Sequence, residues 1–202
     1  MTGELVQVAV AHGVATITLD SPVNRNALST ALVGVLQRLM DADVPTIAAV
    51  DGPARAGGIG LMAACDLVVV RDDLTFALTE VRIGVAAAVI SVPILARVNA
   101  SLLRAAFLTG EPFDAAAARA AGLVTHVTDD VAATVAALCD GICMGAPRAV
   151  AETKRILRLV ATLERDEAFR QMRALSDELF AGPDAAEGMA AFADKRPPSW
   201  QR

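Results

Sequence analysis

Three glycines lie close together in the stretch DGPARAGGIGLMAACDLVVV, residues 51–70, at positions Gly57, Gly58 and Gly60. Their spacing is not that of a dinucleotide-binding turn, and no Lys-Ser or Lys-Thr pair follows as in a nucleotide-phosphate loop. Glycines let a backbone approach a ligand closely and let neighbouring N–H groups point at one atom. The pattern predicts either backbone donors facing a ligand or a tight turn from a strand into a helix.

A single carboxylate follows in the mostly apolar segment FALTEVRIGV, at Glu80. Apolar surroundings would suit this carboxyl to proton transfer near neutral pH. The alternative is a surface carboxylate paired with Arg82. For the two histidines we expect other roles: His12 in a turn, and His126 in a strand with a structural or solvent-facing position.

The alternation of apolar residues predicts the elements that would position these groups. In the first part we expect a β-hairpin (5–11 with 14–19), helices (29–40, 58–65, 93–109, and a short one before Gly122), strands (44–50, 66–71, 123–128) and an extended piece ending near Glu80. Helices are expected over 131–144, 147–161, 163–181 and 183–195. This order predicts an α/β core at residues 1–128 and a helical region at residues 129–202.

The composition indicates which kinds of partner and which cell compartment to expect. The chain has 202 residues, enough for a sizeable core, and a net charge of −5 argues against a nucleic-acid partner. No apolar stretch is long enough to predict a transmembrane helix, so no membrane partner is expected. Of the three cysteines, Cys139 and Cys143 share a helix face and are predicted to be buried free thiols rather than metal ligands. The odd cysteine count and the absence of a signal-peptide pattern favour the cytoplasm.

Five pieces of the sequence, in this order, carry a family resemblance: SPVNRNAL, PTIAAVDGPARAGGIGLMAACDLVVV, FALTEVRIGV, LTGEPFDAAAARAAGLVTHV and EGMAAFADKRPPSW. Together they resemble the enoyl-CoA hydratase/isomerase (crotonase) family. The resemblance implies a spiral of ββα turns with C-terminal helices used in a homotrimer or a dimer of trimers. It also implies an acyl-CoA thioester substrate, with coenzyme A entering as part of the substrate and no other cofactor or metal.

The resemblance assigns roles to the residues noted above. Gly57 matches the position whose N–H forms half of an oxyanion hole for the thioester enolate. Gly58 follows it at a helix N-terminus, Gly60 stands where hydratases of the family often have a first glutamate, and both would lie at the substrate. Glu80 matches the second glutamate, the acid/base, and Asp66 matches a recurrent aspartate that we interpret as structural.

Further positions match the coenzyme A site. Arg25 is a candidate phosphate contact, and an ordinary loop that caps a helix is the alternative for this segment. Lys195, beside Arg196, matches a basic pair near the C-terminus, where a plain solvated charge is the alternative. The residues expected to line the site near the pantetheine and adenine are Asn26, Ala27 and Leu28.

One departure from the family is large. The family has a long segment between the NAL loop and the PTIAAV strand, and the alanine of its GAD turn supplies the second oxyanion N–H; this chain has no GAD tripeptide. Loss of that strand would leave neighbouring N–H and C=O groups unpaired. The leading hypothesis is an enoyl-CoA hydratase that forms a 3-hydroxyacyl-CoA. The alternatives are a double-bond isomerase using the same glutamate, and a catalytically silent subunit used for assembly or for binding a coenzyme A ligand.

Overall fold

The computed structural model describes residues 6–11, 14–19 and 32–201. The chain divides into two compact units. The first holds residues 1–42 and 46–137, and the second holds residues 43–45 and 138–202.

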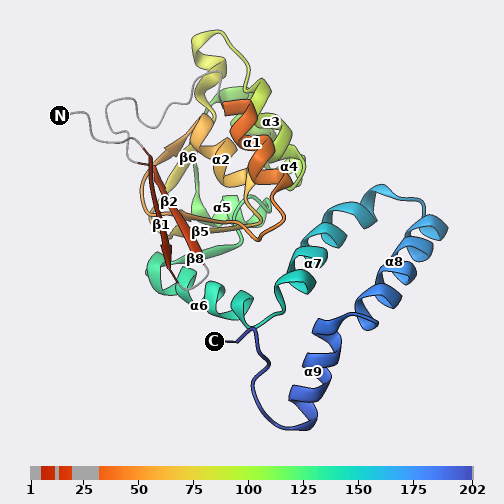
Figure 1. The fold of residues 1–202 in the computed structure, drawn as a ribbon. Coiled ribbons are helices and arrows are strands. Elements are labelled where there is room, and N and C mark those ends of the chain that lie inside the picture. The colour runs from red at the N-terminus through yellow and green to blue at the C-terminus, as the bar shows by residue number, and fades with distance from the viewer. Residues whose placement is uncertain (1–5, 12–13, 20–31, 202) are drawn as a thin grey trace. The chain divides into compact units, whose positions relative to one another are not determined.

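The described strands of the first unit form one hairpin and two three-stranded sheets (Figure 1). The hairpin pairs β1 (Val6–Ala11) with β2 (Val14–Leu19), as the alternation predicted. One sheet has the parallel order β3 (Ile47–Val50), β5 (Leu67–Arg71), β8 (His126–Thr128). In the other sheet β6 (Thr75–Ala77) lies between β4 (Ala54–Arg55), which is parallel to it, and β7 (Phe113–Asp114), which is antiparallel.

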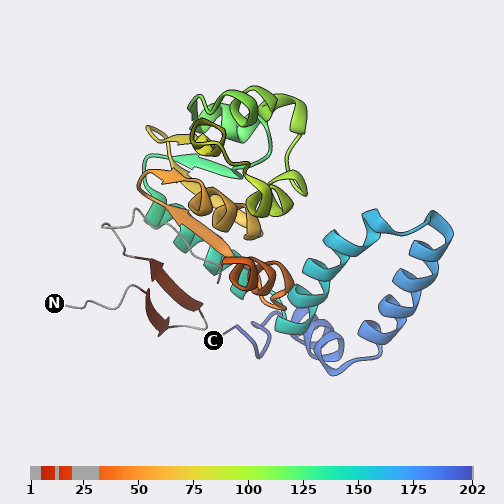
Figure 2. The ribbon, with the colours of Figure 1, turned by 90° about the horizontal axis from the view of Figure 1, so that it is seen from above.

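Helices accompany these sheets, and the unit can be followed from a second direction in Figure 2. They are α1 (Leu32–Asp41), α2 (Gly57–Ala64), α3 (Ala88–Leu95), α4 (Ala100–Thr109), α5 (Ala115–Ala120) and α6 (Val131–Cys143), whose last turns belong to the second unit. Helix α2 is almost wholly apolar, and the core forms around it and β5. The largest side chains sealed in this core include Ile59, Val68, Val70, Phe76, Ile94, Leu103 and Leu123.

The prediction of one helix over residues 93–109 is wrong, because α3 and α4 are separate. Asn99 divides them: its side chain accepts a hydrogen bond from the Ser101 N–H at 3.2 Å, which caps α4. The backbone N–H of Asn99 donates to the Ala121 carbonyl at 2.9 Å, beyond α5. A continuous helix cannot pass through Asn99, because its side chain caps the start of α4 and its backbone N–H donates to Ala121 rather than to a carbonyl one turn earlier.

Asp66 has the structural role expected of it. Its carboxylate accepts from the backbone N–H and the hydroxyl of Thr46, at 2.8 and 2.9 Å, just before β3 begins. The Asp66 N–H in turn donates to the Thr46 hydroxyl at 3.0 Å. These bonds align the starts of β3 and β5. On its other side β3 pairs with no strand among the described residues, as expected if a neighbouring strand is missing.

The C-terminal part of the second unit is largely helical, as predicted for this region of the chain. It contains the end of α6, then α7 (Pro147–Leu159), α8 (Arg165–Phe180) and α9 (Pro183–Ala193). Lys154 on α7 is buried, and its ammonium donates to the Val44 carbonyl at 2.8 Å, which ties residues 43–45 to this unit. Within the described ranges no helix is both long and apolar enough to cross a membrane.

The segment after α9 is held by one carboxylate. Glu187 accepts two hydrogen bonds from the guanidinium of Arg196, at 2.8 and 2.9 Å, and a third from the Ser199 N–H at 2.8 Å. Arg196, and to a smaller extent Ser199, lower the pKa of Glu187 from 4.5 to about 2. Beyond them, the indole N–H of Trp200 donates to the Met144 carbonyl at 3.1 Å.

Acid should release this segment. Because the pKa of Glu187 is lower in the folded chain, its stabilising effect is full above about pH 4.5 and is lost as the pH falls towards about 2. Trp200 is the only tryptophan, so its fluorescence should change in this window. The Glu187→Gln variant should lack that part of the change, while Glu164→Gln, at an exposed glutamate before α8, should keep it. Identical titrations of wild type and Glu187→Gln would contradict this assignment.

Candidate active site

The parallel pairing of β4 with β6 brings the two predicted catalytic segments to one edge of a sheet. The register pairs Arg55 with Ala77 at the ends of these strands. Beyond this pair, one chain continues into Gly57 at the start of α2 and the other into Glu80. Because parallel strands point the same way, both residues emerge at the carboxyl edge, where ligands of such sheets commonly bind.

The start of α2 presents backbone donors at this edge. The Ala56 carbonyl accepts from the N–H groups of Ile59 and Gly60, at 2.9 and 3.2 Å. The N–H groups of Gly57 and Gly58 precede these bonds and belong to the first turn, whose donors have no partner within a helix. They also lie at the positive end of the helix dipole. The start of α2 can therefore bind an oxyanion.

Ala56, just before these glycines, has a backbone conformation that alanine rarely adopts, with φ 46° and ψ −117°. Strain of this kind is concentrated at functional sites, where the surrounding structure holds it. It turns the chain from β4 into α2 and so sets the direction of the first N–H groups. Sequence reasoning missed this residue, because nothing about an alanine signals a positive φ.

The extended piece predicted to end near Glu80 is β6, which ends at Ala77, and Glu80 itself lies on the 3₁₀ turn that follows, Thr79–Ile83. Gly84 closes the turn with φ 81°, and its N–H donates to the Val81 carbonyl at 3.4 Å. Glu80 is half-buried, and its Oε2 atom is sealed from solvent with no hydrogen-bond partner among the described residues. A buried carboxylate oxygen without a partner is costly, and such groups call for an explanation such as a catalytic role.

The alternative role of Glu80, pairing with Arg82, is not what the structure shows. The Arg82 guanidinium instead donates to the Thr109 carbonyl at 2.9 Å and forms an ion pair with Glu111. Glu80 is therefore left available for a reacting group.

Gly60 is buried in close contact with α3. A Cβ atom at this position would lie 2.5 Å from Cγ2 and 2.9 Å from Cβ of Ile90, distances that real Cβ atoms do not reach. No side chain fits at Gly60 unless α3 moves. The structure therefore gives a packing reason for glycine at the position of the family's first glutamate.

Arg97 holds the opposite end of α2, and sequence reasoning missed it as well. Its guanidinium donates to the carbonyls of Cys65 and Ala63, at 2.7 and 3.3 Å, and its Nε to that of Gly122 at 3.3 Å. A cation at a helix C-terminus is favourable. Burial lowers the pKa of Arg97 from its ordinary value. No motif signals this role, because the acceptors are backbone carbonyls.

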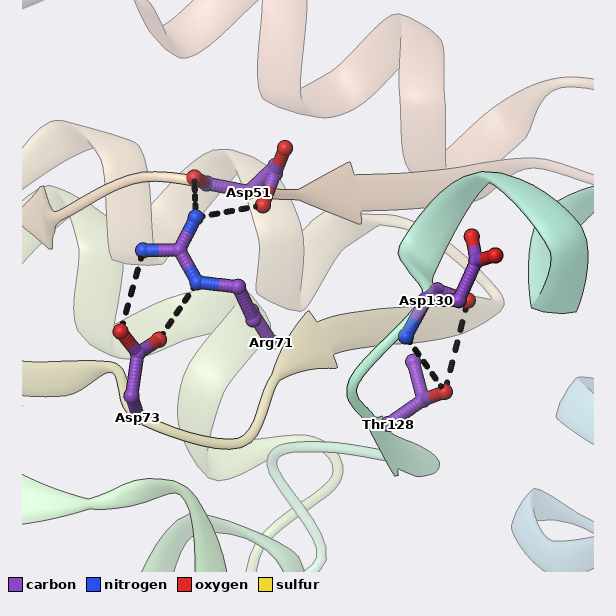
Figure 3. A network of polar contacts seen from close by, with 5 residues as sticks. All are labelled: Asp51, Arg71, Asp73, Thr128 and Asp130. Carbon is purple, nitrogen blue, oxygen red and sulfur yellow. Dashed lines mark hydrogen bonds and ion pairs between the residues drawn. The ribbon is translucent and has the colours of Figure 1, made fainter.

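A second polar cluster lies at the carboxyl ends of β3, β5 and β8 (Figure 3). Arg71 at the end of β5 donates to Asp51 at 2.7 Å and to Asp73 at 2.5 Å, and these hydrogen bonds raise the pKa of Arg71 and lower that of Asp73. At the end of β8, the Thr128 hydroxyl accepts from the Asp130 N–H at 3.2 Å. Because the carboxylates of Asp51 and Asp73 are already bound to the Arg71 guanidinium, we interpret this cluster as structural.

The other predicted site residues lie elsewhere. Lys195 belongs to the second unit, where it is exposed and has φ 53°, and its neighbour Arg196 is bound to Glu187. The coenzyme A segment, Arg25 with Asn26, Ala27 and Leu28, lies outside the described residues, as does His12.

The remaining residues considered in the sequence analysis are the three cysteines and His126. The three cysteines are free thiols, as predicted, but Cys143, the last residue of α6, is exposed rather than buried. Cys139 is half-buried, and burial raises the pKa of its thiol. His126 is half-buried in β8, and its Nδ1 lies 3.0 Å from the Thr125 hydroxyl.

The sequence is similar to those of known proteins. The sequence profile of the family described as enoyl-CoA hydratase/isomerase matches residues 32–202. A Thermus thermophilus protein carrying the name of an enoyl-CoA hydratase is 35% identical over 172 residues, 84% of this chain and 68% of the relative. Carnitinyl-CoA dehydratase of Proteus mirabilis is 31% identical over 175 residues, 82% of this chain and 66% of the relative. The chain thus spans about two thirds of the length of these relatives.

Solved structures show the same fold. An enoyl-CoA hydratase/isomerase from Marinobacter aquaeolei superposes with a TM-score of 0.92 over 99% of this chain and 100% of that one, at 21% identity. An enoyl-CoA hydratase from Mycobacterium avium gives a TM-score of 0.71 at 33% identity, over 98% of this chain and 100% of that one. The chain belongs to the enoyl-CoA hydratase/isomerase (crotonase) family and has the crotonase fold, with a C-terminal helical region.

The packing at Gly60 can be tested by stability. A Gly60→Ala variant should lose about 1–3 kcal/mol of unfolding free energy, because the added methyl overpacks against Ile90. Gly58→Ala is the matched control: its Cβ would lie 3.7 Å from that of Ala54, an ordinary contact, so its stability should be kept. Denaturant unfolding followed by circular dichroism measures both. Equal stability of the two variants would show that α3 does not approach α2 as closely as described.

Proposed function

We propose that this protein is a hydro-lyase of CoA thioesters, which adds water to a 2-enoyl-CoA to give a 3-hydroxyacyl-CoA. The observation that carries the proposal is the Oε2 atom of Glu80, which is sealed from solvent and has no hydrogen-bond partner in the described part of the chain, at the same sheet edge as the first N–H groups of α2. The names of the relatives support it, because a hydratase and a dehydratase run the same reaction in opposite directions.

Glu80 alone would carry out both proton transfers of the reaction. One carboxylate oxygen takes a proton from water while the water oxygen forms a bond to C3 of the enoyl group. The C2–C3 π electrons move towards the thioester and give an enolate, and Glu80 is now the neutral acid. The acid then returns the proton to C2 as the enolate collapses, so water has been added and Glu80 is again ionised.

Gly57 would stabilise the enolate oxygen through its backbone N–H, with the dipole of α2 adding to the effect. One such donor in a dry site contributes about 3–4 kcal/mol to transition-state stabilisation. Glycine at Gly57 and Gly58 keeps side chains out of the path of the acyl group. The second donor of the family belongs to the segment that this sequence lacks, so we expect slower turnover than a site with two donors would support.

A second candidate reaction is the migration of an enoyl-CoA double bond. The observation that favours it is the contact of Gly60 with Ile90, which leaves no room for a second carboxylate to orient water. A single base can move a proton between C4 and C2 of the same enolate without any water. Comparing the products formed from 2-enoyl and 3-enoyl thioesters separates the two reactions.

We also propose that the chain assembles as a homotrimer or a dimer of trimers in the cytoplasm. Large apolar side chains of the second unit support this, because Phe169, Phe180 and Phe192 are 72%, 71% and 87% exposed. Exposed apolar surface of this kind marks protein–protein contacts. Arg25, the residues 26–28 and Gly58 remain the proposed coenzyme A contacts of the first unit. Lys195, on the second unit, remains a prediction from the sequence, and Gly60 is not proposed as a contact because it is buried against Ile90.

Replacing Glu80 tests the proposal. With crotonyl-CoA as the probe, Glu80→Gln should lower kcat by about 10²- to 10⁴-fold, because the amide cannot accept or return a proton. The thermal unfolding temperature should not fall, since Oε2 has no hydrogen bond to lose among the residues that the structure describes. The measurement is the loss of absorbance of the conjugated thioester, with 3-hydroxybutanoyl-CoA confirmed by mass spectrometry.

Asp72→Asn serves as the control, because Asp72 is an exposed carboxylate of the same unit that enters neither the proposed chemistry nor the contacts of the Glu80 turn. Full activity of Glu80→Gln would exclude Glu80 as the acid/base. Absence of turnover by the wild-type chain on both 2-enoyl and 3-enoyl thioesters, with normal assembly, would favour the silent-subunit alternative.

A further inference from the structure

The turn that carries Glu80 has few apolar contacts of its own. Leu78, immediately before it, is buried with 1% exposure, which fixes the entry into the turn. The turn itself, Thr79–Ile83, contains no buried residue, and residues 81–86 are exposed. Hydrophobic burial therefore holds the turn only on the side of Leu78 and leaves the other side to polar contacts.

Arg82 supplies such a contact by reaching from the turn to the end of α4. Its Nε donates to the carbonyl of Thr109, the last residue of α4, at 2.9 Å. Another guanidinium nitrogen forms the ion pair with Glu111. The Thr109 carbonyl lies at the negative end of the helix dipole, so a cation there is favourable.

Gly110 makes room for this arginine. It has φ 69° and ends α4, and a Cβ atom at this position would lie 2.9 Å from Nε, 3.1 Å from Cγ and 3.2 Å from Cδ of Arg82. The side chain of Arg82 thus passes directly over the glycine. The Thr109 carbonyl, the Glu111 carboxylate and the absence of a Cβ at Gly110 together fix the position of the Arg82 side chain.

We propose that Arg82 is a positioning residue for Glu80, which fixes the carboxylate by tethering its turn to the end of α4; this rests on the proposed function of Glu80. The side chains of Arg82 and Glu111 are 48% and 68% exposed, and exposed ion pairs contribute little to global stability. Loss of the tether would therefore act locally. A reacting group displaced by about 1 Å can lose about 10²-fold in rate.

The experiment compares Arg82→Met, which keeps a long side chain but loses the charge, with Arg82→Lys, which keeps one charged donor. Arg104→Met, at an exposed arginine of α4, is the matched control. Each variant is assayed with crotonyl-CoA for kcat and KM and by thermal unfolding. Amide hydrogen exchange of residues 79–85 is measured as well, because it reports on the turn without requiring activity.

Arg82→Met should lower kcat by about 10- to 100-fold with KM unchanged, and should speed exchange in residues 79–85. Its unfolding temperature should match that of Arg104→Met, and Arg82→Lys should recover part of the lost kcat. Unchanged kcat and exchange in Arg82→Met would overturn the proposal, and so would a loss of activity that merely follows a loss of global stability. If the wild type shows no turnover, the proposed function fails, whereas faster exchange in Arg82→Met would still support the tether.

Discussion

The contact between Gly60 and Ile90 is the constraint on which the rest of the site depends. It sets α3 against α2 so closely that no Cβ fits between them. Helix α2 is thereby held from its side by α3 and at its C-terminal end by Arg97, while its first N–H groups stay at the carboxyl edge of the β4–β6 pair. A helix held in this way can direct fixed dipoles at a developing charge without having to reorganise during the reaction.

The same contact limits the chemistry. A carboxylate at Gly60 would need α3 to move away, so of the family's two glutamate positions, both within the described residues, only Glu80 carries a carboxylate. Glu80 has the features expected of an acid/base residue. It is half-buried, one of its oxygens is sealed from solvent with no partner within the described ranges, and Arg82 is bound to the Thr109 carbonyl instead. One base opposite one set of backbone donors can carry a proton to or from the carbon next to a thioester. This proton transfer is common to hydration and to double-bond migration.

Much of this arrangement was predictable from the sequence. The hairpin, the parallel strands and the C-terminal helices follow from the spacing of apolar residues, and the glycines and Glu80 follow from motifs that occur in a fixed order. What could not be predicted depends on contacts between distant segments. The break at Asn99 depends on the Ala121 carbonyl, and the roles of Arg82 and Arg97 depend on carbonyls far along the chain. The positive φ of Ala56 has no signature in residue type. The exposure of Cys143 could not be predicted from its spacing, because Cys139, four residues earlier on the same face of α6, is half-buried.

The most direct measurement of the central claim, that Glu80 transfers a proton at the carbon beside a thioester, is deuterium incorporation into butanoyl-CoA in D₂O, followed by mass spectrometry. This saturated thioester can neither be hydrated nor isomerised, so exchange at C2 reports only on enolate formation and proton transfer. The account predicts incorporation at C2 with the wild-type protein and none above the protein-free rate with Glu80→Gln. No incorporation with the wild type, or equal incorporation with both proteins, would contradict it.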